Sequence, residues 1–169
     1  MKLRFPESEI QQWAERFNSG STETYFMEIS PKIQEQGYLD KRLLKRVARW
    51  KSNRRAGLIE KNDDDYIKDI TSFAFSATSE RARIRALRLL DGVDWPTASV
   101  ILHLFHKDPY PILDFRAMWS IGLDDYKYSS AFWSDYTNFC RDIASRNQVD
   151  MRTLDKALWQ YSKENQPIS

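Results

Sequence analysis

The chain has 169 residues, a length typical of one domain or of two small lobes that share a core. Hydrophobic residues make up 41% of it and charged residues 30%, which provides a globular interior and a solvated surface and excludes a largely disordered chain. The single cysteine, Cys140, excludes an intramolecular disulfide and a four-cysteine zinc or iron–sulfur site supplied by this chain alone. No apolar run approaches the ~20 residues of a membrane span, and no signal-peptide core is present, so we expect a cytoplasmic protein without a membrane partner.

The formal net charge of +2 conceals a strongly basic segment. Between positions 41 and 61 nine basic residues are opposed by Glu60 alone: Lys41, Arg42, Lys45, Arg46, Arg49, Lys51, Arg54, Arg55 and Lys61. Such a stripe on a nearly neutral protein favours a polyanion bound to one face. The alternative is a solvated helix face that acidic residues balance elsewhere.

The predicted elements are almost all helices. Apolar residues at helical spacing predict a first helix from Pro6 to about Phe17, a second from about Ser21, and a third that begins at Leu39–Asp40 and breaks over 53–57. Further helices are predicted from Asn62 or Asp63, from Ser79, and over 95–106, 115–121, 128–146 and 151–161. No segment shows strand alternation bounded by hairpin turns, so the predicted fold class is all-α, with about nine or ten helices.

A Gly-Val turn joins two of these helices at Gly92 and Val93. The N–H groups at the start of the second helix and the positive end of its dipole form an anion site. Thr97 and Ser99 add hydroxyl groups nearby. A DNA phosphate is a natural ligand for such a site, with a monovalent cation as a bridge between the turn and the phosphate. On this fragment alone, an ordinary helical hairpin is the alternative.

The residues from Gly92 to Ala98, followed by Pro111-Ile112-Leu113-Asp114, resemble the helix-hairpin-helix DNA glycosylase superfamily. The pattern is closest to the adenine mismatch glycosylase and endonuclease III branch, and it aligns without a gap from about Leu89 to Gly122. The resemblance implies one two-lobed helical domain over 1–169. The lobe that contains the hairpin spans about 62–125, and the N- and C-terminal helices form the other lobe. The implied phosphate-binding residues are Gly92, Val93, Asp94, Trp95 and Thr97.

In that superfamily the aspartate aligned with Asp114 is the catalytic carboxylate. Cleavage of an N-glycosidic bond builds positive charge on the deoxyribose, and a carboxylate beside the anomeric carbon stabilises that charge and orients water. The alternative for Asp114 is simple N-capping of the helix that follows, a role that is compatible with catalysis.

Two departures from the superfamily pattern refine the expectation. Bifunctional members carry a lysine just before the Thr-Ala pair, where this chain has Pro96, so we expect a monofunctional enzyme that leaves an abasic site. The second hairpin glycine is replaced by Asp94, which tolerates a left-handed conformation but brings negative charge to a phosphate site. No cofactor is required, and neither His103 nor His106 has the partners of a metal site.

The residues that recognise the base are harder to place. The enzyme must flip its target nucleotide into a pocket, and the resemblance implies that the segment before the hairpin supplies pocket and wedge residues. The candidates for pocket or wedge are Trp50, Lys51, Arg54, Trp95 and Tyr110, and further DNA contacts are expected from Arg49, Arg55 and Arg116. Packing is the alternative for Trp50 and Trp95, a role in shaping the linker is the alternative for Tyr110, and a surface ion pair is the alternative for Arg116.

The combined expectation is a monomeric, nucleoid-associated DNA glycosylase. It would bind double-stranded DNA and release a damaged, mismatched or modified base, and a hypermodified phage base is one option for the substrate. A non-catalytic helix-hairpin-helix DNA-binding protein is the first alternative, because it needs the hairpin amides but not Asp114. A helical interaction module whose charges serve only solvation is the second.

Overall fold

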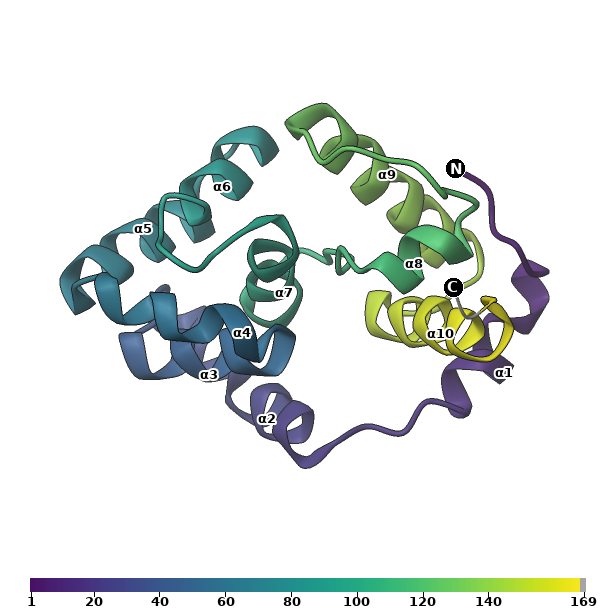
Figure 1. Ribbon diagram of the computed structural model, residues 1–169, viewed down its shortest axis with the longest axis horizontal. Helices are drawn as coiled ribbons and strands as arrows, with labels where there is room; N and C mark the ends of the chain where they lie inside the picture. Colours follow the sequence, from purple (N-terminus) through teal and green to yellow (C-terminus); the bar gives the residue numbers. More distant parts are fainter. Residues whose placement is uncertain (168–169) are drawn as a thin grey trace. The chain divides into compact units, whose positions relative to one another are not determined.

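The computed structural model describes residues 1–167, and in that range the chain forms only helices and the loops between them (Figure 1). The α-helices are α1 (Ile10–Glu15), α2 (Ser21–Gln36), α3 (Lys41–Lys51), α4 (Asn53–Ala56), α5 (Asp64–Ser76), α6 (Glu80–Leu87), α7 (Trp95–Phe105), α8 (Phe115–Ser120), α9 (Ser130–Arg146) and α10 (Met151–Asn165). Two short 3₁₀ helices, η1 (Glu7–Glu9) and η2 (Gly57–Lys61), complete the set. The predicted all-α class with nine or ten helices is confirmed. No helix in the described range is long and apolar enough to cross a membrane.

The chain folds into two compact units. The central unit covers Gly20–Asp108 and contains α2 to α7. The terminal unit combines Met1–Ser19 with the chain from Pro109 onward, and contains α1, α8, α9 and α10. The hairpin lobe expected over 62–125 therefore begins later and ends later than the unit in which the structure places the hairpin.

Amphipathic and fully apolar helices build the core of the central unit. Asp40 caps α3 by accepting a hydrogen bond from the N–H of Leu43 at 2.7 Å, and the helix then buries Leu43, Leu44 and Val47 on one side. The hairpin helix α7 is buried almost all round, as its apolar sequence from 98 to 102 requires. Contacts of α7 with α2, α3 and α6 place the hairpin in the middle of this unit.

The terminal unit is organised around α10, which packs against α1 and α8 (Figure 1). Ser120, the last residue of α8, donates its hydroxyl hydrogen to the carbonyl of Leu158 at 2.6 Å. The N-terminal segment runs beside the end of α8, because the N–H of Arg4 donates to the carbonyl of Ser120 at 2.9 Å. α9 contributes the fully buried Trp133 and Tyr136.

Helix ends are where the sequence predictions needed correction. The expected break over 53–57 is instead the single turn of α4, which leads directly into η2. The helix expected over 128–146 begins at Ser130, because the hydroxyl of Ser129 accepts from the N–H of Phe132 at 3.0 Å and caps it there. α10 continues to Asn165, beyond the predicted end at 161.

Candidate functional site

The turn between α6 and α7 requires glycine at position 92. Gly92 has a φ of +84°, in the left-handed region that residues with a side chain rarely adopt. A Cβ atom at this position would lie 2.9 Å from Cδ1 of Ile59 and 3.1 Å from the carbonyl oxygen of Arg55. The turn is therefore packed so closely against α4 and η2 that a side chain at position 92 would push the Ile59 side chain aside and press on the backbone of Arg55 and Ile59.

Asn62 connects this turn to η2 by side-chain hydrogen bonds. Its side-chain amide donates to the carbonyl oxygens of Asp91 at 3.0 Å and Ile59 at 3.1 Å, and its Oδ1 accepts from the N–H of Asp91 at 2.9 Å. Asn62 is only 3% exposed. From the sequence, Asn62 is expected only to begin a helix, because no local pattern predicts a hydrogen-bond partner 29 residues away.

Asp94 caps α7 and has a cationic neighbour. One carboxylate oxygen accepts from the N–H of Thr97 at 3.2 Å, and the other lies 3.5 Å from Nε of Arg55. The positive charge of Arg55 therefore offsets the negative charge that the replacement of the second hairpin glycine introduces. Arg55, expected as a DNA contact, is in this structure also a partner of the turn.

Two N–H groups of the turn have no hydrogen-bond acceptor within residues 1–167. The N–H of Val93 donates to the carbonyl of Leu90 at 3.1 Å, and the N–H of Thr97 is occupied by Asp94. The N–H groups of Gly92 and Asp94 donate to no acceptor among residues 1–167. Because they precede the positive end of the α7 dipole, they favour an anion.

The basic segment does not form one continuous stripe. In α3, the side chains of Arg42, Arg46 and Arg49 are exposed, and Arg46 lies over the ring of Tyr25 at 3.7 Å. In the same segment, Lys41 and Lys45 form ion pairs with Glu60. Residues of α3, together with Glu60 and Asp64, line a surface hollow of about 660 Å³.

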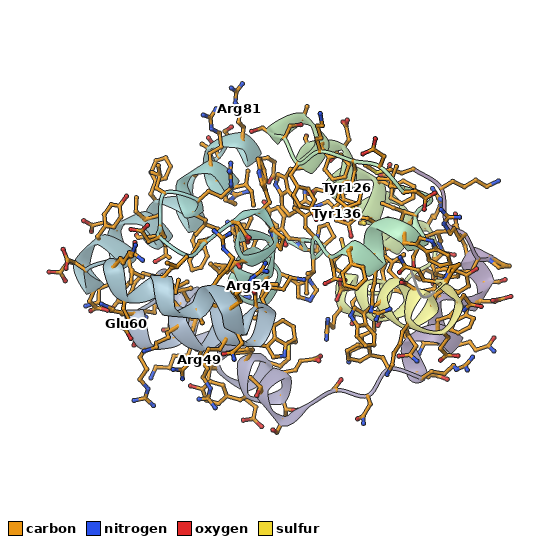
Figure 2. All side chains as sticks on the ribbon, in the orientation of Figure 1. Arg49, Arg54, Glu60, Arg81, Tyr126 and Tyr136 are labelled. Carbon is orange, nitrogen blue, oxygen red and sulfur yellow. The ribbon has the colours of Figure 1, made fainter. Side chains whose placement is uncertain are left out.

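Arg54 belongs to a different surface. Figure 2 shows Arg49 and Arg54 on different sides of the α3–α4 pair. Arg54 is exposed, and its neighbour Arg55 is the half-buried partner of Asp94. The part of the basic segment that adjoins the Gly92 turn is therefore α4, and the larger cluster of α3 lies on another face.

The candidate pocket residues of the central unit are only partly accessible. Trp50 is half-buried, with its ring edge-on to Phe26 at 5.9 Å, which fits the packing alternative. Lys51 is half-buried as well. Trp95, also half-buried, has the guanidinium of Arg88 over its ring at 4.1 Å.

In the terminal unit, Asp114 occupies the N-cap of α8 as predicted. One of its carboxylate oxygens accepts from the N–H of Arg116 at 3.0 Å, and its carbonyl accepts from the N–H of Met118 at 2.9 Å. The side chain is half-buried. The cap therefore fixes the direction of the carboxylate.

A buried tyrosine holds the segment that leads to Asp114. Tyr136 lies on α9 (Figure 2), and its hydroxyl donates to the carbonyl of Ile112 at 3.0 Å. Burial raises the pKa of Tyr136 well above its ordinary value, and the negative charges of Asp155 and Asp114 act in the same direction. Tyr136 therefore stays a hydrogen-bond donor at any physiological pH. Sequence reasoning missed it, because an apolar helix face gives no sign of which tyrosine reaches a distant carbonyl.

The other predicted residues of the terminal unit differ in exposure. Tyr110 is fully buried; its ring stacks on Trp133 at 5.8 Å and lies under the guanidinium of Arg141 at 4.6 Å. It therefore shapes the linker, the alternative named for it. Arg116 is half-buried and sends its guanidinium over the rings of Phe115 and Trp159.

The predicted site residues are thus distributed over both units. Gly92, Asp94 and Arg55 come together around the turn in the central unit, whereas Asp114 and Arg116 share the start of α8 in the terminal unit. His106 is buried at the end of α7, and its Nδ1 accepts from the N–H of Asp108 at 2.9 Å. No group of three or more metal-ligating side chains occurs within the described residues.

Comparisons with protein-family models, with curated proteins and with solved structures give no match for this chain. The functional argument therefore depends on the residues themselves.

Proposed function

We propose that the protein is a monofunctional DNA glycosylase that hydrolyses the N-glycosidic bond of a damaged, mismatched or modified base and leaves an abasic site. The observation that carries the proposal is the Gly92 turn, which disfavours a side chain and whose N–H groups at Gly92 and Asp94 have no acceptor within residues 1–167. The turn is followed, at the spacing of the helix-hairpin-helix glycosylase pattern, by Asp114 at the N-cap of α8.

In the proposed reaction, water displaces the base from the deoxyribose. A water molecule adds its oxygen to C1′ of the deoxyribose, the bond from C1′ to the base nitrogen breaks, and the base leaves with the bonding electrons and gains a proton. The carboxylate of Asp114 stabilises the positive charge that builds on the sugar and accepts the proton of the attacking water. The hydrogen bond from the N–H of Arg116 holds the carboxylate in place for this role.

The turn and its neighbours bind the DNA. A phosphate of double-stranded DNA accepts from the turn amides, a monovalent cation can bridge the two, and the exposed Arg54 adds positive charge near by. Pro96 stands where strand-cleaving relatives of this pattern carry a lysine nucleophile. The absence of that amine supports hydrolysis by water without cleavage of the strand.

A non-catalytic DNA-binding protein is the second candidate function. It is favoured by the hydrogen bond from the N–H of Arg116 to Asp114, since N-capping alone gives this carboxylate a structural role. The two functions differ in one result, because Asp114→Asn preserves a cap and DNA binding in both, but abolishes base release only in the first.

The experiment incubates the protein with duplexes that carry a panel of damaged, mismatched and modified bases, including modified phage DNA, and scores strand scission with and without hot alkali. We expect scission only after alkali and a loss of at least about 100-fold in rate for Asp114→Asn. Asp150→Asn is the matched control, because Asp150 caps α10 of the same unit by accepting from the N–H of Thr153 at 2.6 Å. Tight binding by wild type and Asp114→Asn without release of any base would favour the second candidate.

A further inference from the structure

A row of cations and aromatic rings extends from the start of α8 to the end of α10. The guanidinium of Arg116 lies 5.0 Å from the ring centre of Phe115 and 5.2 Å from that of Trp159. The ammonium of Lys163 lies 5.2 Å from the centre of the same Trp159 ring. We call Phe115, Arg116, Trp159 and Lys163 the cation–aromatic strip. All four residues belong to the terminal unit.

Packing holds the strip in place. Phe17, just after α1, meets Trp159 edge-on at 5.2 Å, and α10 packs against both α1 and α8. Trp159 is thereby fixed as the platform on which the charges of Arg116 and Lys163 rest. A cation over an aromatic ring keeps its full charge and its N–H donors, so it can still bind an anion.

Phe115 is the solvent-exposed aromatic residue at one end of the strip. Its side chain is 57% exposed, although it lies next to Asp114 in the chain and at the first position of α8. The guanidinium of Arg116 is the cation nearest to its ring. An exposed aromatic ring beside a cation offers a stacking surface to a planar group and a donor to the phosphate attached to it.

We propose that the cation–aromatic strip binds a stretch of unpaired DNA beside the bond on which Asp114 acts. Phosphates contact Arg116 and Lys163, and one unstacked base lies on the ring of Phe115. The alternation of rings with cations fits this ligand, because a nucleic-acid strand alternates bases with phosphates, whereas an acidic peptide has no need of the ring. The inference rests on the proposed function only for the position of the reacting bond, and it assigns that function a substrate class, DNA with locally unpaired bases.

The test measures binding of the full chain to three labelled DNA ligands by fluorescence anisotropy: a single strand, a paired duplex, and the same duplex with a two-base bulge. We expect the single strand and the bulged duplex to bind about tenfold more tightly than the paired duplex, as a single base–aromatic stack allows. Phe115→Ser should remove that preference, and Phe115→Tyr should keep it. Phe73→Ser is the matched control, because Phe73 is 54% exposed in the central unit.

Salt dependence tests the two cations. The double variant Arg116→Gln/Lys163→Gln should lower the slope of log affinity against log salt for the single strand by about 1.4, since each phosphate contact contributes roughly 0.7. Lys127→Gln removes an exposed charge from the same unit and should leave the slope unchanged. Equal affinity for the three DNA ligands, or displacement of the single strand by polyglutamate as effectively as by unlabelled DNA, would overturn the inference.

These results separate the two proposals. Asp114→Asn should retain the preference for unpaired DNA, so a protein with that preference and no base release contradicts only the proposed function. A protein that releases a base but binds unpaired and paired DNA alike, with Phe115→Ser unchanged, contradicts only the inference about the strip.

Discussion

Asp94 and Asp114 each cap the start of a helix, and their surroundings differ. Asp94 caps α7 in the central unit, with one carboxylate oxygen on the N–H of Thr97 and the other beside Arg55. Asp114 caps α8 in the terminal unit through the N–H of Arg116, but the guanidinium of Arg116 lies over aromatic rings. The same residue type at the same helical position therefore serves as part of a closed turn in one unit and as an oriented carboxylate in the other.

An aspartate that caps a helix can also have a second role, because the cap occupies only one of its two carboxylate oxygens. N-capping contributes about 1 kcal/mol and uses one carboxylate oxygen. At Asp94 the second oxygen lies beside Arg55, so the two opposite charges offset each other. At Asp114 the cap orients the side chain, and Tyr136 secures the preceding residues by its hydrogen bond to Ile112.

The largest effect is expected from Gly92→Ala. The new Cβ would lie 2.9 Å from Ile59 and the φ of +84° would strain alanine, so we expect a loss of about 2–4 kcal/mol in the free energy of unfolding and of most DNA affinity. Urea unfolding and anisotropy titration measure both. Gly57→Ala is the control: it has a φ of −63° and no atom within 4 Å of a new Cβ, so it should stabilise the protein by about 0.5 kcal/mol. A neutral Gly92→Ala would contradict the account of the turn.

Asn62→Ala comes next. It leaves the N–H and carbonyl of Asp91 without their side-chain partner, which should cost about 2–3 kcal/mol of unfolding free energy. DNA affinity should fall with it, because the turn loses its attachment to η2. The exposed Asn138, replaced by alanine, is the control and should change neither quantity. Loss of stability with full DNA affinity would show that the turn does not bind the phosphate.

The positions of the turn and of the capping aspartate could be predicted from the sequence, but the distant residues that hold them in place could not. Asp114 at an N-cap and Gly92 in the turn follow from local rules of helix capping and backbone conformation. The partners Asn62 and Tyr136 could not be predicted, because each meets its carbonyl through tertiary packing. The one-turn helix at 53–56 could not be predicted either, because four polar or small residues show no helical periodicity of apolar side chains and indicate only an interruption of the preceding helix.

A smaller effect is expected from Tyr136→Phe. The variant removes only the hydrogen bond to the carbonyl of Ile112, so we expect a loss of about 1 kcal/mol in stability and a several-fold slower base release at saturating enzyme. Tyr161→Phe is the matched control, because it removes a similar 3.0 Å bond to the carbonyl of Arg4. Equal release rates in both variants would show that Tyr136 does not position Asp114.

The smallest expected effect is on the pH dependence of the free energy of unfolding, to which one residue of each unit contributes. Burial lowers the pKa of His106 below 6.5, so its contribution to stability is present above pH 6.5 and is lost as the pH falls further, when the unfolded chain takes up a proton. A hydrogen bond from Arg146 lowers the pKa of Glu7 from 4.5 to about 2, so its contribution is lost only between those values. Urea unfolding from pH 8 to 3 should show His106→Gln flattening the first decline and Glu7→Gln the second. His103→Gln is the control for the first. A His106→Gln protein with an unchanged decline between pH 7.5 and 5.5 would contradict this assignment.

The most direct test compares Asp114→Asn and Asp94→Asn in single-turnover base release at saturating protein, with binding to the same DNA measured in parallel. Asparagine keeps the cap at both positions, so folding should survive in both. We predict that Asp114→Asn binds like wild type but releases base at least about 100-fold more slowly, and that Asp94→Asn releases base at nearly the wild-type rate. Equal release rates for Asp114→Asn and wild type would contradict the assignment of Asp114 as the catalytic carboxylate.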